Sequence, residues 1–187
     1  MSGLFYFTAS RLDAILAAMM NSYTTQQIID HFGMQPLGQE GGWFVETYRA
    51  AEKIARAGLD SRYPGDRCYC TDILYLLTPE SCSKIHRVRS DEIFHYHLGD
   101  PARMLWLCPD GGSREIIIGP DILHGQQVQV IVPRGTWQGA RLIDAGRWCL
   151  MSCTVAPGFE YEDYEHGSRN ELITRWPQRK NDILQLT

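Results

Sequence analysis

The stretch IHRVRSDEIFHYHLGD, residues 85–100, holds three histidines and three acidic side chains within sixteen residues. Side chains alternate between the two faces of a regular strand, so His95 and His97 oppose Glu92 in the run EIFHYHL. A β-bulge would shift this register by one residue and bring both histidines round to Glu92. On a regular strand we expect His95 and His97 on an outer face or at a dimer contact.

Further runs rich in Val, Ile, Tyr, Trp, Phe and Thr lie on both sides of this stretch, separated by Gly, Pro, Asp and Asn. Such runs predict strands, and no clear helix lies between them. The nine predicted strands are 42–50, 68–78, 83–88, 92–98, 103–109, 114–119, 127–133, 136–143 and 147–157. The pattern favours an antiparallel sandwich or barrel over a βαβ fold.

The two ends of the chain have helical patterns. Apolar residues recur at helical spacing over 12–19, and TTQQIIDHFG (24–33) offers a threonine cap and a glycine stop. We expect residues 1–33 to form a helical extension packed on a single domain, 34–187. The tail reads as a polar helix interrupted before Pro177, followed by a segment that packs or frays. The long loop 51–66 is either a flexible flap or a lid.

Composition limits the classes of function. The chain has 187 residues, 44% of them apolar, and a formal net charge of -4, which gives no reason to expect nucleic acid as a partner. The apolar N-terminal stretch contains Arg11 and Asp13 and is too short and too charged to span a bilayer. The six cysteines form no C-x-x-C pair, which favours free thiols in a reducing, cytoplasmic compartment.

Five ordered blocks carry a resemblance to a known family. HRVRSDEIFHYHLG and VPRGTWQGA resemble the two signature motifs of the cupin superfamily. With GGWFVETYR, LYLLTP and VAPGFEYEDYE, the order of blocks is similar to that of a small, functionally uncharacterised cupin-like family, over residues 28–165. The resemblance implies an all-β, double-stranded β-helix, the RmlC-like jelly roll, and commonly a homodimer.

The sequence departs from the general cupin pattern at the expected metal ligands. His86, Glu92 and Gly99 match the first motif, but Val88 stands at its second histidine and Gln138 at the histidine of the second motif. A divalent first-row ion needs three or four donors, whereas His86 and Glu92 supply two and Gln138 a weak neutral oxygen. We predict no cofactor and no tightly bound metal, with a weakly held divalent ion as the alternative.

The resemblance places His86 and Glu92 at the mouth of the barrel, as the catalytic candidates. His86 could act as a general base that Glu92 orients, or the two could form a buried pair that satisfies itself. Strand parity suggests further residues on the same faces, because Glu46 and Tyr48 share one parity and Lys84 shares that of His86. The predicted ligand-binding residues are Glu46, Tyr48, Tyr75, Lys84, Tyr96, Gln129 and Gln138.

These residues suit a cupin that binds a small polar metabolite, such as a sugar or nucleotide derivative, in its barrel. Three alternatives stay open. The first is a metal-independent isomerase or epimerase that uses His86 as base and a tyrosine as acid, by analogy with the sugar-nucleotide epimerases of the same fold. The others are a metal-dependent cupin enzyme and a non-catalytic dimeric module.

Overall fold

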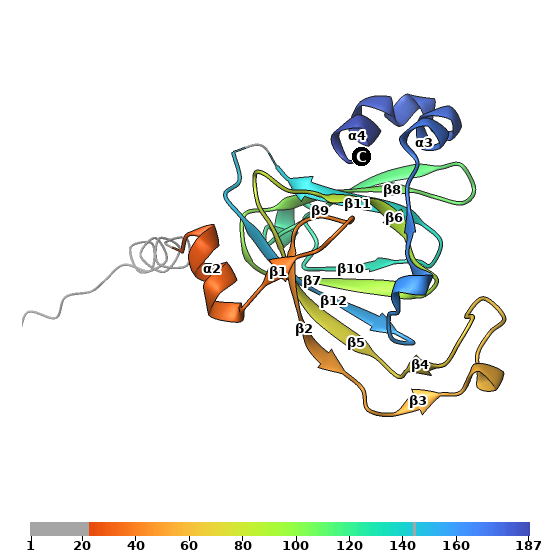
Figure 1. Ribbon diagram of the computed structural model, residues 1–187. Coiled ribbons are helices and arrows are strands. Elements are labelled where there is room, and N and C mark those ends of the chain that lie inside the picture. The colour runs from red at the N-terminus through yellow and green to blue at the C-terminus, as the bar shows by residue number, and fades with distance from the viewer. Residues whose placement is uncertain (1–22, 144) are drawn as a thin grey trace, which may run out of the picture.

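The computed structural model describes residues 23–143 and 145–187, in which two antiparallel sheets face each other (Figure 1). The first sheet has the order β1 (Gln35–Pro36), β2 (Trp43–Arg49), β5 (Thr71–Leu77), β12 (Cys149–Ala156), β7 (Asp91–Gly99), β10 (Gln129–Val132). The second has the order β13 (Glu165–His166), β6 (Ser83–Arg87), β11 (Trp137–Leu142), β8 (Ala102–Leu107), β9 (Ser113–Ile118). A separate pair joins β3 (Lys53–Ile54) and β4 (Arg67–Cys68).

The nine predicted strands are all present, and the expected jelly roll is confirmed. The structure adds four strands of two residues each, β1, β3, β4 and β13, which the sequence did not predict. Two residues are too few to show the alternation by which a strand is recognised. These short strands nevertheless matter, because β1 and β13 flank loops that close the site described below.

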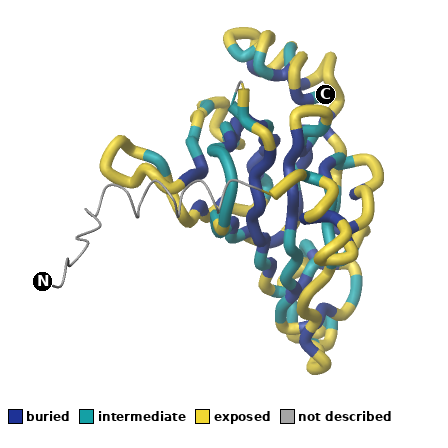
Figure 2. The backbone as a smooth tube through the Cα atoms, turned by 90° about the vertical axis from the view of Figure 1, so that its left-hand side faces the viewer, coloured by how far each residue is buried: buried dark blue, intermediate teal, exposed yellow. Residues whose placement is uncertain are grey.

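The main core lies between the facing sheets, where Leu77, Phe94, Met104 and Met151 are at most 3% exposed. In Figure 2 the buried backbone runs through the middle of the sandwich, while the connecting loops are exposed. The expected alternation holds in the first half of β7, since Phe94 packs into this core and His95 pairs with Gln129 of β10 on the opposite face. Inward positions of β7 and β12 therefore point at the second sheet.

Helix α2 (Thr25–Phe32) precedes the first sheet, as expected from its sequence. The Thr24 hydroxyl accepts a hydrogen bond from the Gln27 amide, and Gly33 ends the helix in the left-handed conformation. Its buried face, Ile28 and Ile29, packs on the outer side of the six-stranded sheet. The helix expected over 8–19 lies outside the described residues.

The C-terminal tail packs on the outer face of the second sheet rather than fraying. It forms α3 (Arg169–Arg175) and α4 (Lys180–Gln185), separated at Pro177 by a single 3₁₀ turn (Figure 1). Trp176 and Ile183 are at most 1% exposed and cluster with Ile85 and Trp137. Trp137 therefore belongs to this outer cluster and does not face the barrel interior. None of the described helices is long and apolar enough to span a membrane.

The long loop carries β3 and a 3₁₀ turn (Arg56–Gly58) and leads into β4, and its far part is fastened to the turn between β6 and β7. The Tyr63 hydroxyl lies 2.9 Å from Ser90 Oγ, and Arg62 Nε donates to the Arg89 carbonyl at 3.0 Å. No residue of 50–66 lines the barrel cavity. The loop therefore does not line the cavity, and its far part is fastened over the β6–β7 turn rather than free. All six cysteines are free thiols, and Cys68, Cys149 and Cys153 are buried.

Candidate functional site

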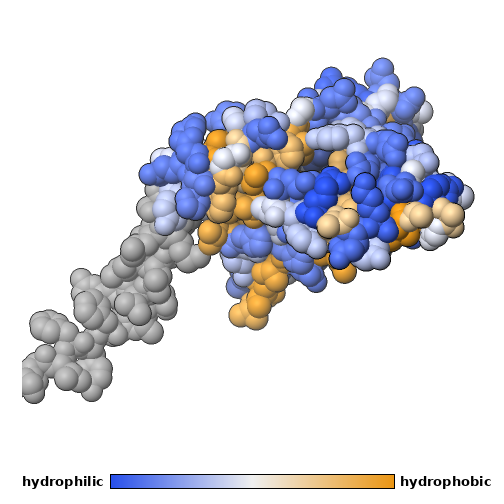
Figure 3. All heavy atoms as spheres, turned by 60° about the horizontal axis from the view of Figure 1, so that its bottom comes forward, coloured by the Kyte–Doolittle hydropathy of each residue, from blue (hydrophilic) through white to orange (hydrophobic). Residues whose placement is uncertain are grey.

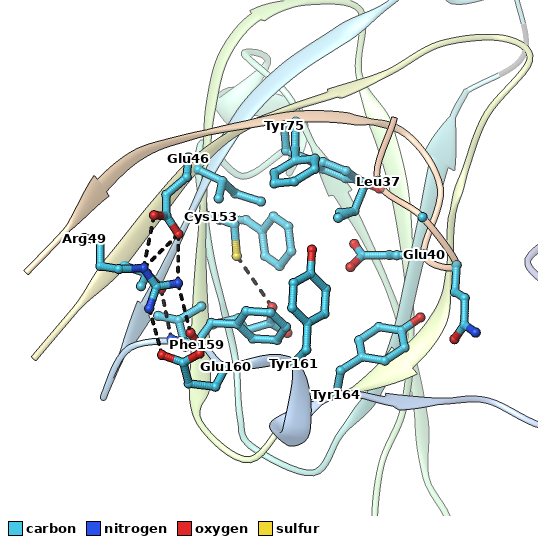
Figure 4. Close-up of a pocket in the computed structure, with 18 residues that line it drawn as sticks. Leu37, Glu40, Glu46, Arg49, Tyr75, Cys153, Phe159, Glu160, Tyr161 and Tyr164 are labelled. Carbon is cyan, nitrogen blue, oxygen red and sulfur yellow. Dashed lines mark hydrogen bonds and ion pairs between the residues drawn. The ribbon is translucent and has the colours of Figure 1, made fainter. Parts of the chain in front are cut away.

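A cavity of about 430 Å³ opens on the inner face of the six-stranded sheet. Inward side chains of β2, β5, β7 and β12 form its base, and two loops, 37–40 and 159–164, enclose it from the sides (Figure 4). Six aromatic rings give it mainly apolar walls: Phe44, Tyr75, Phe94, Phe159, Tyr161 and Tyr164. The size and lining are those of a small-molecule site.

A buried polar layer joins the two sheets beside this cavity. His86 on β6 and Gln138 on β11 are register partners in the second sheet, and Glu92 faces them from β7 of the first. Gln138 Nε2 donates to Glu92 Oε2 at 2.7 Å and to His86 Nε2 at 3.1 Å. His86 Nδ1 donates to the Lys84 carbonyl at 2.8 Å. These contacts hold His86 as the tautomer whose Nε2 accepts a hydrogen bond.

Glu40, which sequence reasoning missed, completes this layer. It lies in the loop between β1 and β2, and its carboxylate points into the cavity beside Tyr161 (Figure 4). Its Oε1 accepts from Ser83 Oγ at 3.1 Å, and its Oε2 lies 3.9 Å from His86 Nε2. No spacing in the sequence marks an acid in an irregular loop as the neighbour of a strand histidine, so only the fold reveals it.

The close approach of these groups shifts their protonation. Burial raises the pKa of Glu92 to about 7, and the nearby Glu40 carboxylate adds to the rise while His86 opposes it. Burial alone would lower the pKa of His86, but the carboxylates of Glu40 and Glu92 outweigh it and raise that pKa. Glu92 can therefore gain or lose a proton near neutral pH at the wall of the cavity.

Tyr164 separates His86 from the cavity. Its ring stacks on the imidazole, with 5.2 Å between ring centroids and 24° between planes, and its hydroxyl lies 2.9 Å from His166 Nδ1. Glu92 and Tyr164 line the cavity, but His86 and Gln138 do not, and both are at most 1% exposed. His86 and Gln138 thus lie behind Glu92 and do not face a ligand.

The predicted face of β2 is wrong at Tyr48. Glu46 lines the cavity, but Thr47 is an extra residue in a bulge against β5, so Tyr48 turns outward and is 54% exposed. The bulge brings Arg49 to the cavity instead. Tyr75, the other predicted aromatic of this region, lines the cavity and donates its hydroxyl to the Gly41 carbonyl at 2.8 Å.

Three further residues predicted to bind the ligand, Lys84, Gln129 and Tyr96, do not line the cavity. Gln129 lies on the outer face, 3.4 Å from His95 Nδ1, because Val130 occupies the inward position of β10. Lys84 lies outside the cavity lining and contributes its backbone carbonyl to His86. Tyr96 packs against the core away from the cavity, and its hydroxyl donates to the Gly99 carbonyl at 2.5 Å.

Arg49 forms an ion-pair network at the rim of the cavity. Its guanidinium contacts Glu46 Oε2 at 2.9 Å and Glu160 Oε1 at 2.8 Å, and it also donates to the Phe159 carbonyl. The hydrogen bonds that Arg49 donates to Glu46, with the charges of Glu46 and Glu160, raise the pKa of Arg49 despite the opposing effect of burial. Among the described residues that line the cavity, Arg49 is the one with a cationic side chain, and it is fully engaged.

The donor set around His86 does not fit the four-ligand metal site of a general cupin. Val88 offers no donor, and Gln138 presents its amide N–H, not its oxygen, to His86 and Glu92. The Gln138 amide nitrogen thus donates to the two side chains, His86 and Glu92, that would have to coordinate an ion. Within residues 23–143 and 145–187, no group of three or more His, Cys, Asp or Glu side chains is arranged to hold a metal ion.

Comparisons with known proteins agree with this architecture. The family described as cupin superfamily (DUF985) matches residues 26–167. An uncharacterised protein of Saccharomyces cerevisiae is 31% identical over 135 residues, 67% of each chain. A hypothetical protein from Leishmania major has a TM-score of 0.79 at 30% identity, over 88% of this chain and 99% of that one. A Shewanella oneidensis protein has a TM-score of 0.78 at 25% identity, over 88% and 98%.

Proposed function

The chain belongs to the DUF985 family of the cupin superfamily, and we propose that it binds a small molecule in the barrel cavity. The observation that carries this proposal is the cavity of about 430 Å³ with six aromatic rings and a small number of polar and charged side chains in its lining. Ligand sites in proteins have this size and this mixture of apolar walls and sparse polar groups. A barrel packed only by its own side chains would leave no such space.

The lining favours a molecule with a flat or apolar body and hydrogen-bond donors. A sugar ring or a nucleobase meets both conditions, since it can stack on Tyr161 or Tyr164 and donate to Glu40 or Glu92. A phosphate group meets neither condition, because it has no apolar body and accepts hydrogen bonds instead of donating them. The cationic side chain in the lining, Arg49, is already held by Glu46 and Glu160. We therefore place the sugar or base part of a metabolite, and not its phosphates, in the cavity.

Filling the cavity tests this proposal. Ile73 lines the cavity, so we expect Ile73→Trp to abolish the thermal shift produced by any metabolite of a library that stabilises the wild-type protein. Ile131 is 54% exposed on the outer face, and Ile131→Trp is the matched control that should keep the shift. An Ile73→Trp variant that is folded and still responds like the wild type would contradict binding in the barrel.

Acid-base catalysis at Glu92 is a second candidate, favoured by its pKa of about 7 at the cavity wall. A metal-independent isomerase or epimerase needs such a group within reach of its substrate. In this version Glu92 exchanges the proton and His86, behind it, holds its charge and orientation. Glu92 must then titrate near neutral pH. The test is to compare how the stability of the wild-type protein and of Glu92→Gln depends on pH.

We propose that the site works without a tightly held metal. The support is the Gln138 amide, which donates to both His86 and Glu92 where a bound ion would need acceptors. We expect elemental analysis of freshly purified protein to give iron, nickel, manganese and zinc far below one ion per chain. Near-stoichiometric metal that is lost in His86→Ala would overturn the proposal.

A homodimer and a cytoplasmic location stay predictions. For the dimer, apolar side chains that could be buried at a contact are exposed, with Leu123 at 88% and Ile122 at 61%. Apolar side chains also gather on part of the face shown in Figure 3, among a mostly charged and polar surface.

A further inference from the structure

At the end of the cavity that holds Glu40 and Glu92, here called the inner end, the donors of the neighbouring buried side chains are already in use. Gln138 gives one N–H to Glu92 and the other to His86, His86 gives Nδ1–H to a carbonyl, and Tyr75 gives its hydroxyl to Gly41. The donors of these three side chains are thus in use. A ligand that binds here has to bring donors of its own, because polar groups that are buried without partners lose free energy.

The acceptors at this end are left over. Behind the cavity wall, Gln138 Oε1 is buried without any hydrogen-bond partner in the described structure, but it does not line the cavity. Glu92, 6% exposed, receives only the Cys153 thiol at its Oε1, at 3.6 Å. Glu40 Oε2 has His86 Nε2 at 3.9 Å, beyond hydrogen-bond distance. Two carboxylates therefore face the cavity with unused acceptor capacity.

The charge of the lining points the same way. Four carboxylates line the cavity, Glu40, Glu46, Glu92 and Glu160, against the single guanidinium of Arg49, which Glu46 and Glu160 hold. After that network is discounted, Glu40 and Glu92 remain at the inner end without a cationic lining residue, and the titratable His86 lies behind the wall with its Nε2 accepting from Gln138. Such a site attracts a cation and repels an anion.

The walls suit a cation with an apolar body. Figure 4 shows Tyr161 and Tyr164 standing beside the Glu40 carboxylate, with Phe159 on the neighbouring wall. The faces of aromatic rings attract ammonium groups, and their area buries apolar carbon at the same time. Carboxylates and rings together are the features that recognise an organic cation.

We propose that the barrel selects a primary amine in its ammonium form, with the ammonium between Glu40 and Glu92 and an apolar or aromatic body against the tyrosine and phenylalanine walls. This inference rests on the proposed ligand-binding function and specifies its ligand class. An amino sugar or an arylalkyl amine has this chemistry, whereas a carboxylic acid or a phosphate of equal size does not. The ammonium supplies the donors and the positive charge that the inner end lacks.

Three probes with one body and different head groups test the inference. Isothermal titration at pH 8 would compare 2-phenylethylamine, 2-phenylethanol and phenylacetate on the full chain. We expect the amine to bind about ten-fold more tightly than the alcohol, through charge-assisted hydrogen bonds, and phenylacetate to bind most weakly. Binding of phenylacetate as tight as that of the amine, or no binding by the amine, would overturn the inference.

A matched pair of variants locates the effect. Glu40→Gln should bring the affinity ratio of amine to alcohol close to one while leaving the alcohol almost unchanged, because only the charge is removed. Glu171→Gln, on the exposed face of α3, is the control that should keep the ratio. An unchanged ratio in Glu40→Gln also counts against the inference. The proposed function is judged separately by Ile73→Trp. If a neutral ligand binds the wild-type protein and not this variant, binding in the barrel is supported even where the preference for an amine is not.

Discussion

Replacing Asp163 with alanine is expected to lower the free energy of unfolding by about 3–5 kcal/mol, because it removes the buried carboxylate that a buried guanidinium contacts through two hydrogen bonds. Arg67 and Asp163 have side chains only 1% and 2% exposed. Two parallel hydrogen bonds join them, Arg67 Nε to Oδ2 at 2.8 Å and Nη2 to Oδ1 at 2.7 Å. Urea unfolding measures the loss, which corresponds to a fall of roughly 10 °C in the midpoint of thermal unfolding.

Glu162 provides the matched control for this variant. It contacts the same Arg67 Nη2 at 2.9 Å, but its side chain is 51% exposed, so Glu162→Ala should cost less than about 1 kcal/mol. Equal losses in the two variants would show that burial of the pair is not what matters. Asp163 lies between Tyr161 and Tyr164, so the variant should also loosen the cavity wall and weaken binding of any cavity ligand.

The regular part of this fold could be predicted because apolar and polar residues alternate along its strands. In EIFHYHL the alternation correctly placed Phe94 inside and His95 outside. The positions of Gly, Pro and Asp correctly separated the nine main strands. The cupin motifs also identified the residues of the buried polar layer, His86, Glu92 and Gln138.

The cavity itself could not be predicted, because its decisive residues lie where alternation fails. One extra residue at Thr47 exchanges Tyr48 for Arg49 at the rim, and a bulge has no reliable mark in a single sequence. Glu40 and Tyr164 stand on irregular loops more than a hundred residues apart, and only the paired sheets bring both to His86. The alternation of side chains along strands also could not predict that Tyr164, on a loop, covers His86 and leaves Glu92 facing the cavity.

The burial of Glu92 beside Glu40 makes the site a source of instability. A carboxyl group buried against a second carboxylate is held at a protonation state different from that of the unfolded chain. Folding energy is therefore linked to pH through the same residue that lines the cavity. Sites built for binding or catalysis commonly carry such a penalty, which a ligand of opposite charge would relieve.

The second large effect is expected in the pH dependence of stability. The pKa of Glu92 is about 7 in the folded protein and 4.5 as the ordinary value, so between these pH values the folded state holds a proton that the unfolded state has lost. Stability therefore falls as pH rises through this window, by about 3 kcal/mol in total at 1.36 kcal/mol per pKa unit. The raised pKa of His86 acts in the same direction, since its favourable charge is lost as pH rises through that pKa.

Glu92→Gln should remove the larger part of this dependence, because glutamine keeps the acceptor for Gln138 but carries no titrating proton. At pH 8 we expect the variant to be more stable than the wild-type protein by up to about 3 kcal/mol, and near pH 5 the two should be almost equal. Urea unfolding at half-unit steps from pH 5 to pH 8 gives both curves. Glu171→Gln, an exposed carboxylate on α3, should follow the wild-type curve. Superimposable curves for Glu92→Gln and the wild type would mean that Glu92 does not titrate in this window, and the acid-base role at the cavity wall would fail with it.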